Sequence, residues 1–493
     1  MKNKFIKYLV VLTAGTFLLL GNSCKKLEEF GDTNVNPNGS PDVLTSALLT
    51  NVLSGIGGTV ADLNTGHYSQ IFAEPTYPGN SLYVLPQFDA SGIYSGALND
   101  LQVIINRNSD PATAASVSVD GANANQIAIS RILKAYYFWT ITDRWGDVPY
   151  SEALKGVSFA TPKYDEQQAI YLDLLKELKE ANAQFLDNAT AIRGDIVYGG
   201  NIAKWKKLSN TLRMLISLRM SKRDGDPGID AAGEFADAAA NGFIDDNADN
   251  FTISFPGGNF RNSFNNFSLS ADNRTSQTIV DLITGLADTR VNAFFSNTSG
   301  VPYGLSTAAP TSITYGKILS ETWHAEAAPL VIVNAASGLL AKAEAIALGW
   351  MTGDAKATYE NGVMQSFQQW GQTMPANYLS TGAANFTTGT GVASIGGATV
   401  AGSNALTPDA LSRIRLQQFI AFYPSGIQTW SNWRRTGVPD LKPTVNATAG
   451  DGIIRRYVYG QSDQNLNSAQ LAIAVARIPG GVDDQDARVW WDR

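Results

Sequence analysis

Residues 125–149 have the sequence NQIAISRILKAYYFWTITDRWGDVP, and this stretch decides the class of fold. Within residues 125–142, large apolar side chains recur at helical spacing, at Ile127, Ile129, Ile132, Leu133, Tyr136, Tyr137 and Trp139. This spacing predicts a helix whose apolar stripe is wide enough to be buried on most of its circumference. Gly146 and Pro149 predict that the helix ends at Trp145.

The same periodicity recurs along the chain. It predicts further helices over residues 165–186, 202–220, 331–350, 355–370 and 408–422. Small residues in the 331–350 segment, Ala341, Ala343, Ala345 and Ala347, allow a partner helix to approach closely. Paired helices of this length predict a mostly α fold that resembles a tetratricopeptide-like array, with long insertions between the pairs.

Polar, turn-rich segments separate the predicted helices. They cover residues 64–97, 248–275, 296–326 and 375–407, and the first three interleave aromatic residues with amides, glycines and prolines. Segments of this length are too long to be simple connectors. Binding residues are common on such loops, because a rigid scaffold holds them at the surface.

The N-terminus has the pattern of an export signal. Three lysines within the first seven residues precede an apolar run from Tyr8 to Leu20, and small residues follow up to Cys24. A basic start, about a dozen apolar residues and a small-residue end are typical of a secretory signal peptide. The run is shorter than the ~20 residues that span a bilayer. We therefore predict a signal peptide at residues 1–23.

Cys24 is the only cysteine in the sequence, so it cannot form an internal disulfide. It stands where a bacterial lipoprotein signal is cleaved and the new N-terminus acylated, although Gly21-Asn22-Ser23 departs from the strict lipoprotein box. The alternative is an ordinary secreted protein with an incidental cysteine. We predict lipid attachment at Cys24 and a single mature domain over residues 24–493.

The charge of the chain restricts its partners. Removing residues 1–23 removes three lysines and no acids, which lowers the net charge from −7 to about −10. An acidic chain is poorly suited to nucleic acid or anionic lipid headgroups, so we expect no nucleic-acid partner. No later apolar run is long enough to span a membrane, and acyl chains are the expected membrane contact.

Several motifs follow one another in a recognisable order. They are residues 32–38 (DTNVNPN), 139–153 (WTITDRWGDVPYSEA), 195–200 (DIVYGG) with Lys204-Trp205, Ala343-Glu344-Ala345 with Gly349-Trp350, 433–439 (WRRTGVP) and 489–492 (VWWD). Together they resemble the SusD/RagB family of Bacteroidetes outer-membrane nutrient-binding lipoproteins. The resemblance spans nearly the whole mature chain.

The resemblance implies a mostly α protein with about four tetratricopeptide-like helix pairs, whose long loops and minor β structure form a ligand-binding face. It implies a lipid-anchored protein of the cell outer membrane that faces the exterior. Such a protein captures an oligomeric nutrient, an oligosaccharide or an oligopeptide, and hands it to a SusC-like TonB-dependent porter. It implies no enzymatic activity and no cofactor, and it leaves open whether calcium braces a loop.

Two other classes of function stay open. The chain has two histidines, His67 and His324, and no HExxH motif or metal-ligand spacing that the sequence defines, so we predict no catalytic and no metal site. A surface glycoside hydrolase would need two carboxylates facing each other across a cleft. A structural or adhesive surface lipoprotein is the second alternative.

The motifs that indicate the family are expected to be structural. Residues 144–147 follow a helix and should cap it and pack against the next segment. Trp433-Arg434-Arg435 should form a buried ion pair with an acid such as Asp440 or Asp143. Trp490-Trp491 should act as a hydrophobic clasp at the C-terminus.

Ligand residues are expected where aromatic rings meet amides, because rings stack on sugar faces and amides bond to hydroxyl or peptide groups. In the family the site draws on two loops that correspond here to residues 66–95 and 300–325. We predict ligand contacts from Tyr77, Tyr83, Trp323 and His324, and secondarily from Asn80, Asn259, Phe260 and Asn262. The alternative for each is that it packs its own loop.

The predicted anchor is testable by substitution. Cys24→Ser should leave the protein soluble or uncleaved, because the sequence provides no other membrane-binding element. Fractionation of cells into membrane and soluble parts measures the effect. An unchanged membrane fraction, with porter contacts disrupted in the same experiment, would refute acylation at Cys24.

Overall fold

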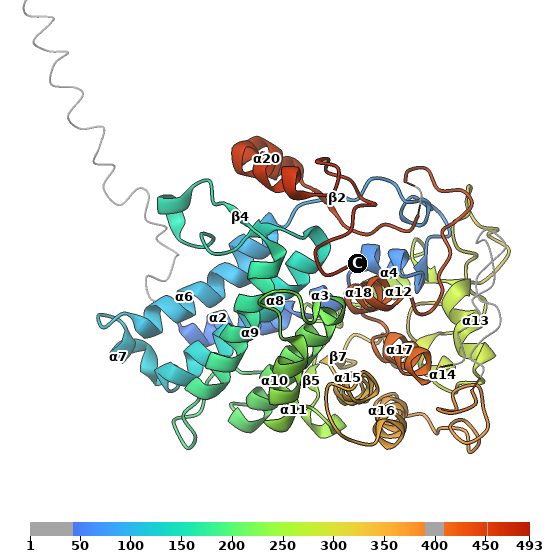
Figure 1. Cartoon of the computed structure of the whole chain (residues 1–493), viewed down its shortest axis with the longest axis horizontal. Coiled ribbons are helices and arrows are strands. Elements are labelled where there is room, and N and C mark those ends of the chain that lie inside the picture. The colour runs from blue at the N-terminus through green and yellow to red at the C-terminus, as the bar shows by residue number, and fades with distance from the viewer. Residues whose placement is uncertain (1–42, 390–408, 451) are drawn as a thin grey trace, which may run out of the picture. The chain divides into compact units, whose positions relative to one another are not determined.

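The computed structural model describes residues 43–389, 409–450 and 452–493 (Figure 1). Residues Thr45–Arg493 form one compact unit. The predicted signal peptide, Cys24, the motif at residues 32–38 and residues 390–407 of the last predicted loop lie outside the described residues. The single mature domain beginning at residue 24 therefore stays a prediction.

Helices dominate the structure. The first half of the unit contains α2 (Thr45–Gly55), α3 (Gly57–Val60), α4 (Leu63–Tyr68), α5 (Ser91–Ile93), α6 (Asn99–Ser109), α7 (Ala114–Val117), α8 (Asn123–Trp145), α9 (Gln167–Gln184), α10 (Ile202–Arg219) and α11 (Ala231–Ala240). The second half contains α12 (Asn265–Leu269), α13 (Gln277–Gly285), α14 (Val291–Phe294), α15 (Ala335–Ala347), α16 (Ala355–Gln369), α17 (Ala410–Ala421), α18 (Gly426–Thr436), α19 (Gln461–Leu466) and α20 (Ser468–Arg477). With 50% helix and 6% strand, the predicted mostly α class is confirmed.

The strands are short and pair two by two. They are β1 (Phe72–Ala73), β2 (Gln87–Phe88), β3 (Val148–Pro149), β4 (Tyr164–Asp165), β5 (Phe251–Ile253), β6 (Arg274–Thr275), β7 (Leu330–Val333) and β8 (Val458–Tyr459). The pairs β1–β6, β3–β4 and β5–β7 are antiparallel, and β2–β8 is parallel. Three of these pairs join segments far apart in the sequence, so the strands connect loops rather than build a layer.

The stretch at residues 125–149 forms α8 and the turn that ends it. The helix runs three residues past the predicted apolar segment, to Trp145, and Ile129, Ile132 and Phe138 are fully buried. Gly146 follows at φ 85°, a backbone conformation that glycine adopts without strain. The predicted helix with a wide buried stripe is confirmed.

The other predicted helices match closely, with one correction. Helices α9, α10, α16 and α17 lie within two or three residues of the predicted bounds. For the helix predicted over residues 331–350, the predicted start was wrong. Residues Leu330–Val333 form strand β7 instead, which pairs with β5. Asn334 then caps α15 by accepting the Ser337 N–H at 2.7 Å.

The first helices pack as antiparallel pairs. Gln167 at the start of α9 donates to the Thr142 carbonyl near the end of α8, at 2.7 Å. Arg131, early in α8, contacts Glu177, late in α9, at 2.9 Å. Helices α10 and α11 also pack antiparallel to each other. Figure 1 shows α8, α9, α10 and α11 side by side.

Two further pairs, α15 with α16 and α17 with α18, continue the array. The alanine-rich face of α15 allows close approach: a Cβ added to Gly362 of α16 would lie 2.9 Å from Leu340 Cγ. In α17, Gln418 donates to the Leu340 carbonyl at 3.2 Å. Four helix pairs are thus present in the described residues, which confirms the tetratricopeptide-like arrangement.

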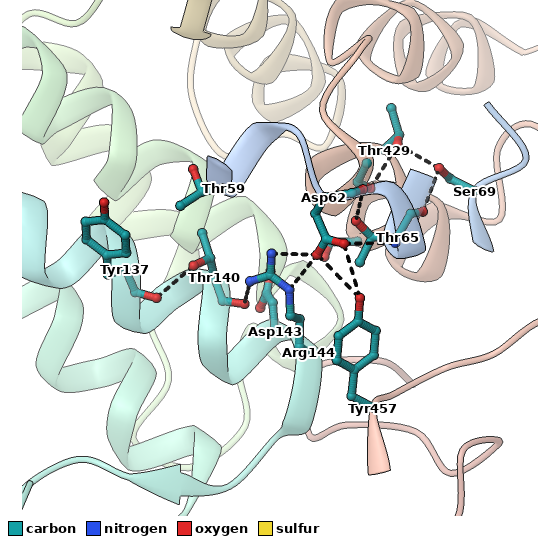
Figure 2. A network of polar contacts seen from close by, with 12 residues as sticks. Thr59, Asp62, Thr65, Ser69, Tyr137, Thr140, Asp143, Arg144, Thr429 and Tyr457 are labelled. Carbon is teal, nitrogen blue, oxygen red and sulfur yellow. Dashed lines mark hydrogen bonds and ion pairs between the residues drawn. The ribbon is translucent and has the colours of Figure 1, made fainter. Parts of the chain in front are cut away.

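Three of the motifs place residues in buried structural positions. Arg144, in the last turn of α8, pairs with Asp62 at 2.7 Å, as Figure 2 shows. Trp491 is fully buried, and its indole N–H donates to the Asp143 carboxylate at 3.0 Å, so the predicted C-terminal clasp is present. Arg434 donates to the Asp143 carbonyl oxygen at 2.7 Å rather than to an acid.

The buried ion pair expected for the motif at residues 433–435 is present, but its acid is Glu344 rather than either of the two acids named above. The Arg435 guanidinium donates two hydrogen bonds to the Glu344 carboxylate, at 2.8 and 2.7 Å. Neither Asp440 nor Asp143 is its acid partner. Arg415 also donates to Glu344, at 2.8 Å. The motif at 343–345 on α15 is therefore joined to the motif at 433–439 on α18 by a fully buried carboxylate.

Glu344→Gln should reduce stability and flatten its acid dependence. Burial by itself would raise the pKa of Glu344, but Arg435 and Arg415 lower it from 4.5 to about 2. Because the folded pKa is depressed, the stabilisation is complete above about pH 4.5 and disappears as the pH falls through 2, an effect of about 3 kcal/mol. Urea unfolding at a series of pH values between 7 and 2 measures how the free energy of unfolding depends on the charge of Glu344.

A matched control is Glu360→Gln, which removes one exposed acid paired with Lys356 on α16. This substitution should change the free energy of unfolding by less than about 0.5 kcal/mol. If Glu344→Gln and the control show the same unfolding free energy at neutral pH, the buried carboxylate does not join α15 to α18 as described.

Candidate ligand-binding site

The two loops predicted to form the site are joined directly. The Ala309 N–H donates to the Pro75 carbonyl at 2.6 Å, and the Tyr83 and Tyr303 ring centroids lie 6.4 Å apart. A third segment joins them, because the Thr448 N–H donates to the Leu82 carbonyl at 2.8 Å. The loop junction therefore combines residues 74–85, 303–309 and 444–448.

Tyr83 lies inside this junction. Its side chain is fully buried, its backbone has φ 60°, and the Thr444 N–H donates to its hydroxyl at 3.4 Å. Burial raises the pKa of Tyr83 to about 12, although hydrogen bonds from Thr444 and other neighbours oppose the rise. In this conformation Tyr83 packs the loops and presents no ring face to a ligand.

Tyr77 lies on the outside of the same junction, with 73% of its surface exposed. The turn that carries it is braced by Glu74, whose two carboxylate oxygens accept the Asn80 backbone and side-chain N–H groups at 2.8 and 2.7 Å. The Gly79 N–H closes the turn on the Tyr77 carbonyl at 2.8 Å. Asn80 thus holds the turn, and the Tyr77 ring is an exposed aromatic platform on a fixed backbone.

Phe260 has a similar placement on a second loop. It is 61% exposed and sits on a tight turn, where Gly257 and Phe260 exchange backbone hydrogen bonds at 3.1 and 3.3 Å. Gly257 and Gly258 have φ values of 87° and 65°, which side chains other than glycine rarely adopt. Asn259 lies exposed on the same turn.

The remaining predicted residues hold this second loop in place. Asn262 is buried and donates to the Ala328 carbonyl at 3.0 Å. His324 is buried, with Nδ1 3.2 Å from the Leu319 carbonyl and Nε2 3.1 Å from Glu321. Trp323 packs edge to face against Trp370 at 4.8 Å beside an enclosed cavity of about 30 Å³.

The structure thus divides the eight predicted residues by exposure. Tyr77, Asn259 and Phe260 face outward, whereas Tyr83, Asn262 and His324 are buried. Asn80 and Trp323 are half-buried. Ligand contact by the exposed residues stays a prediction.

A separate pocket of about 410 Å³ contains residues that the sequence did not single out as ligand contacts. Tyr94, Tyr164 and Tyr459 line this pocket. Tyr94 lies near the end of the predicted loop at residues 64–97, whereas Tyr164 and Tyr459 lie almost three hundred residues apart in the sequence. The pairings β3–β4 and β2–β8 bring them together. Nothing local in the sequence indicates these pairings, because each strand has only two residues.

No group of three or more His, Cys, Asp or Glu side chains that could hold a metal ion occurs in the part of the chain that the structure describes. Within those residues, no helix combines the length and apolar character needed to cross a bilayer. Both histidines are buried, and His67 lies 3.2 Å from Asn273.

The helix array with its braced surface loops defines a class of mostly α proteins built from helix pairs. The family model for SusD-like proteins, described as starch-binding and associating with the outer membrane, matches residues 37–460. The chain belongs to this family. No match was found among curated protein sequences.

Solved structures agree with this assignment. A chitin-binding SusD homolog from Flavobacterium johnsoniae is 26% identical with a TM-score of 0.73, covering 91% of this chain and 98% of its own. SusD homologs from Bacteroides uniformis and Bacteroides fragilis are 24% and 22% identical, with TM-scores of 0.77 and 0.75. Each of these covers 92% of this chain and 100% of its own, and both support the fold alone.

Proposed function

We propose that this protein is a lipid-anchored nutrient-binding protein of the outer membrane, exposed at the cell surface, that binds an oligomeric glycan and delivers it to a SusC-like TonB-dependent porter. The family description and the chitin-binding relative support a glycan ligand. The observation that carries the proposal is the pair of exposed rings, Tyr77 and Phe260, each on a backbone turn held by hydrogen bonds.

An exposed ring on a held backbone turn suits an oligosaccharide. Sugar rings have apolar faces that stack on aromatic side chains, and a backbone turn that hydrogen bonds already hold loses little conformational entropy on binding. Asn259 lies exposed beside Phe260, where its amide is available to sugar hydroxyls. An oligopeptide would use the same rings and amides, and it is the second ligand to be tested.

A binding role without catalysis fits the histidine environments. His67 and His324 are buried and bonded within the chain, so neither is placed to act on a ligand held by Tyr77 or Phe260. Delivery to the porter requires an additional surface. Val84, Leu85 and Val445 are exposed apolar residues, and the Leu82–Thr448 hydrogen bond brings their loops together. Contiguous exposed apolar surface commonly marks a protein interface.

Tyr77→Ala combined with Phe260→Ala should weaken glycan binding strongly. Each stacked ring contributes on the order of 1 kcal/mol, so losing both should raise the Kd about thirtyfold. Calorimetry on chitin and starch oligosaccharides, and on oligopeptides, measures the loss and identifies the ligand class. Circular dichroism should be unchanged, because exposed loop residues contribute little to the core.

The conservative changes Tyr77→Phe and Phe260→Tyr keep both rings and should retain binding. Wild-type affinity in the double alanine variant would place the ligand elsewhere on the surface. Tight binding of peptides with no binding of either oligosaccharide would assign the site to oligopeptides.

Extraction with mild detergent should recover this protein together with a porter of much larger mass. A lid over a porter buries a large interface, above the ~2,000 Å² typical of permanent complexes. Val84→Ser, Leu85→Ser and Val445→Ser together should reduce recovery of the porter. Leu186→Ser changes an exposed leucine next to α9 and serves as the control. A clean monomer at low salt and low detergent would contradict the proposed partner.

A further inference from the structure

The pocket of about 410 Å³ beside α19 is preformed by hydrogen bonds between its walls. The Tyr94 hydroxyl donates to the Pro149 carbonyl, and the Tyr459 hydroxyl donates to the Asp147 carbonyl, both at 2.7 Å. Elsewhere in the lining, the Asn467 amide donates to the Pro162 carbonyl at 2.7 Å. The pocket volume lies in the range usual for small-ligand sites.

The interior of this pocket is mostly apolar. Tyr164, Tyr459 and Trp145 form its buried floor, and Tyr94 forms a half-buried wall. Leu466, at the mouth, is 75% exposed. An apolar, concave surface of this kind excludes water from one face of a ligand and strengthens electrostatic contacts at its edge.

Two carboxylates at the edge carry charge that no cation balances. Asp463 accepts hydrogen bonds from the Tyr164 hydroxyl and the Gly460 N–H, and Asp89 accepts from the Ser462 hydroxyl and the Ser91 N–H. Within the described residues, no lysine or arginine forms an ion pair with either acid, and the donors to both carboxylates are neutral.

The surrounding cations are engaged elsewhere. Lys163 pairs with Asp165 at 3.2 Å, and Arg477 pairs with Asp147 at 2.6 Å. Burial raises the pKa of Asp463, and repulsion from Asp89 adds to the rise while hydrogen bonds from Tyr164 and Gly460 oppose it. A positively charged group bound at the mouth would relieve this repulsion.

We propose that this pocket is a second binding site, for a sugar unit that carries a free ammonium group. The apolar walls fit the C–H face of a sugar ring, the carboxylates of Asp89 and Asp463 fit its ammonium, and Ser95 and Asn467 at the edge offer partners for its hydroxyls. The pocket shares no residue with the turns of Tyr77 and Phe260. An experiment can therefore support or refute this second site independently of the glycan site proposed above.

The test compares two tetrasaccharides with the full mature chain in detergent at low ionic strength. One consists of glucosamine units, which are cationic, and the other of N-acetylglucosamine units, which are neutral. Asp89→Asn with Asp463→Asn should weaken glucosamine binding at least about tenfold, because hydrogen bonds to charged groups contribute that much. The same double variant should leave binding of the neutral oligomer unchanged.

Ser95→Trp is a second, independent variant. Ser95 is exposed and lines the pocket, so an indole there should block ligand entry without removing a packed side chain. It should abolish glucosamine binding while circular dichroism and melting stay unchanged. Asp187→Asn with Glu360→Gln removes the same charge from the loop after α9 and from α16, and it should have no effect.

Three results would overturn the proposal. The first is equal affinity of the wild-type chain and the Asp89/Asp463 variant for the glucosamine tetramer. The second is absence of glucosamine binding by the wild-type chain, even where the neutral oligomer binds. The third is binding of a lysine-containing tetrapeptide, blocked by Ser95→Trp, with no binding of the glucosamine tetramer, which would assign the pocket to basic peptides.

Discussion

The Arg144 guanidinium donates two hydrogen bonds to the Asp62 carboxylate, at 2.9 and 2.7 Å, in a region almost closed to water (Figure 2). The Tyr457 hydroxyl approaches the same carboxylate at 3.4 Å, and Ser69 continues the network to Thr429 of α18 at 2.9 Å. These hydrogen bonds link the segment around α4 and the end of α8 to α18 and to the C-terminal segment that contains Tyr457. Removing either charge would leave the other buried and unpaired, at a cost of about 3–5 kcal/mol.

The motifs that indicate the family describe this interior rather than the ligand surface. Asp143, Glu344, Arg435 and Trp491 are all buried, and their polar atoms join α8, α15, α18 and the C-terminus. Such residues tolerate few replacements, because each satisfies a charge or a hydrogen bond in a place without water. The Tyr77 side chain itself, which is 73% exposed, is under no such constraint. A family with one scaffold can therefore bind different ligands through its loops.

The sequence predicted the scaffold well, but it could not predict which candidate site residues are buried, for a physical reason. Helix α8 is specified by residues three and four positions apart, and its periodicity is visible without any tertiary contact. Tyr83 is buried through contacts with Tyr303 and Thr444, which lie hundreds of residues away in the sequence. Its burial was therefore not predictable from its own loop. The same holds for β7, whose partner strand β5 lies almost eighty residues earlier.

The parallel pair β2–β8 joins Gln87 to Val458 and Phe88 to Tyr459. During synthesis, Gln87 and Phe88 are therefore made long before their partners Val458 and Tyr459. The pocket beside α19 and the network around Asp62 are assembled only when the last segment arrives. A chain that ends before residue 457 would therefore lack both the β2–β8 pair and the Tyr457 contact to Asp62.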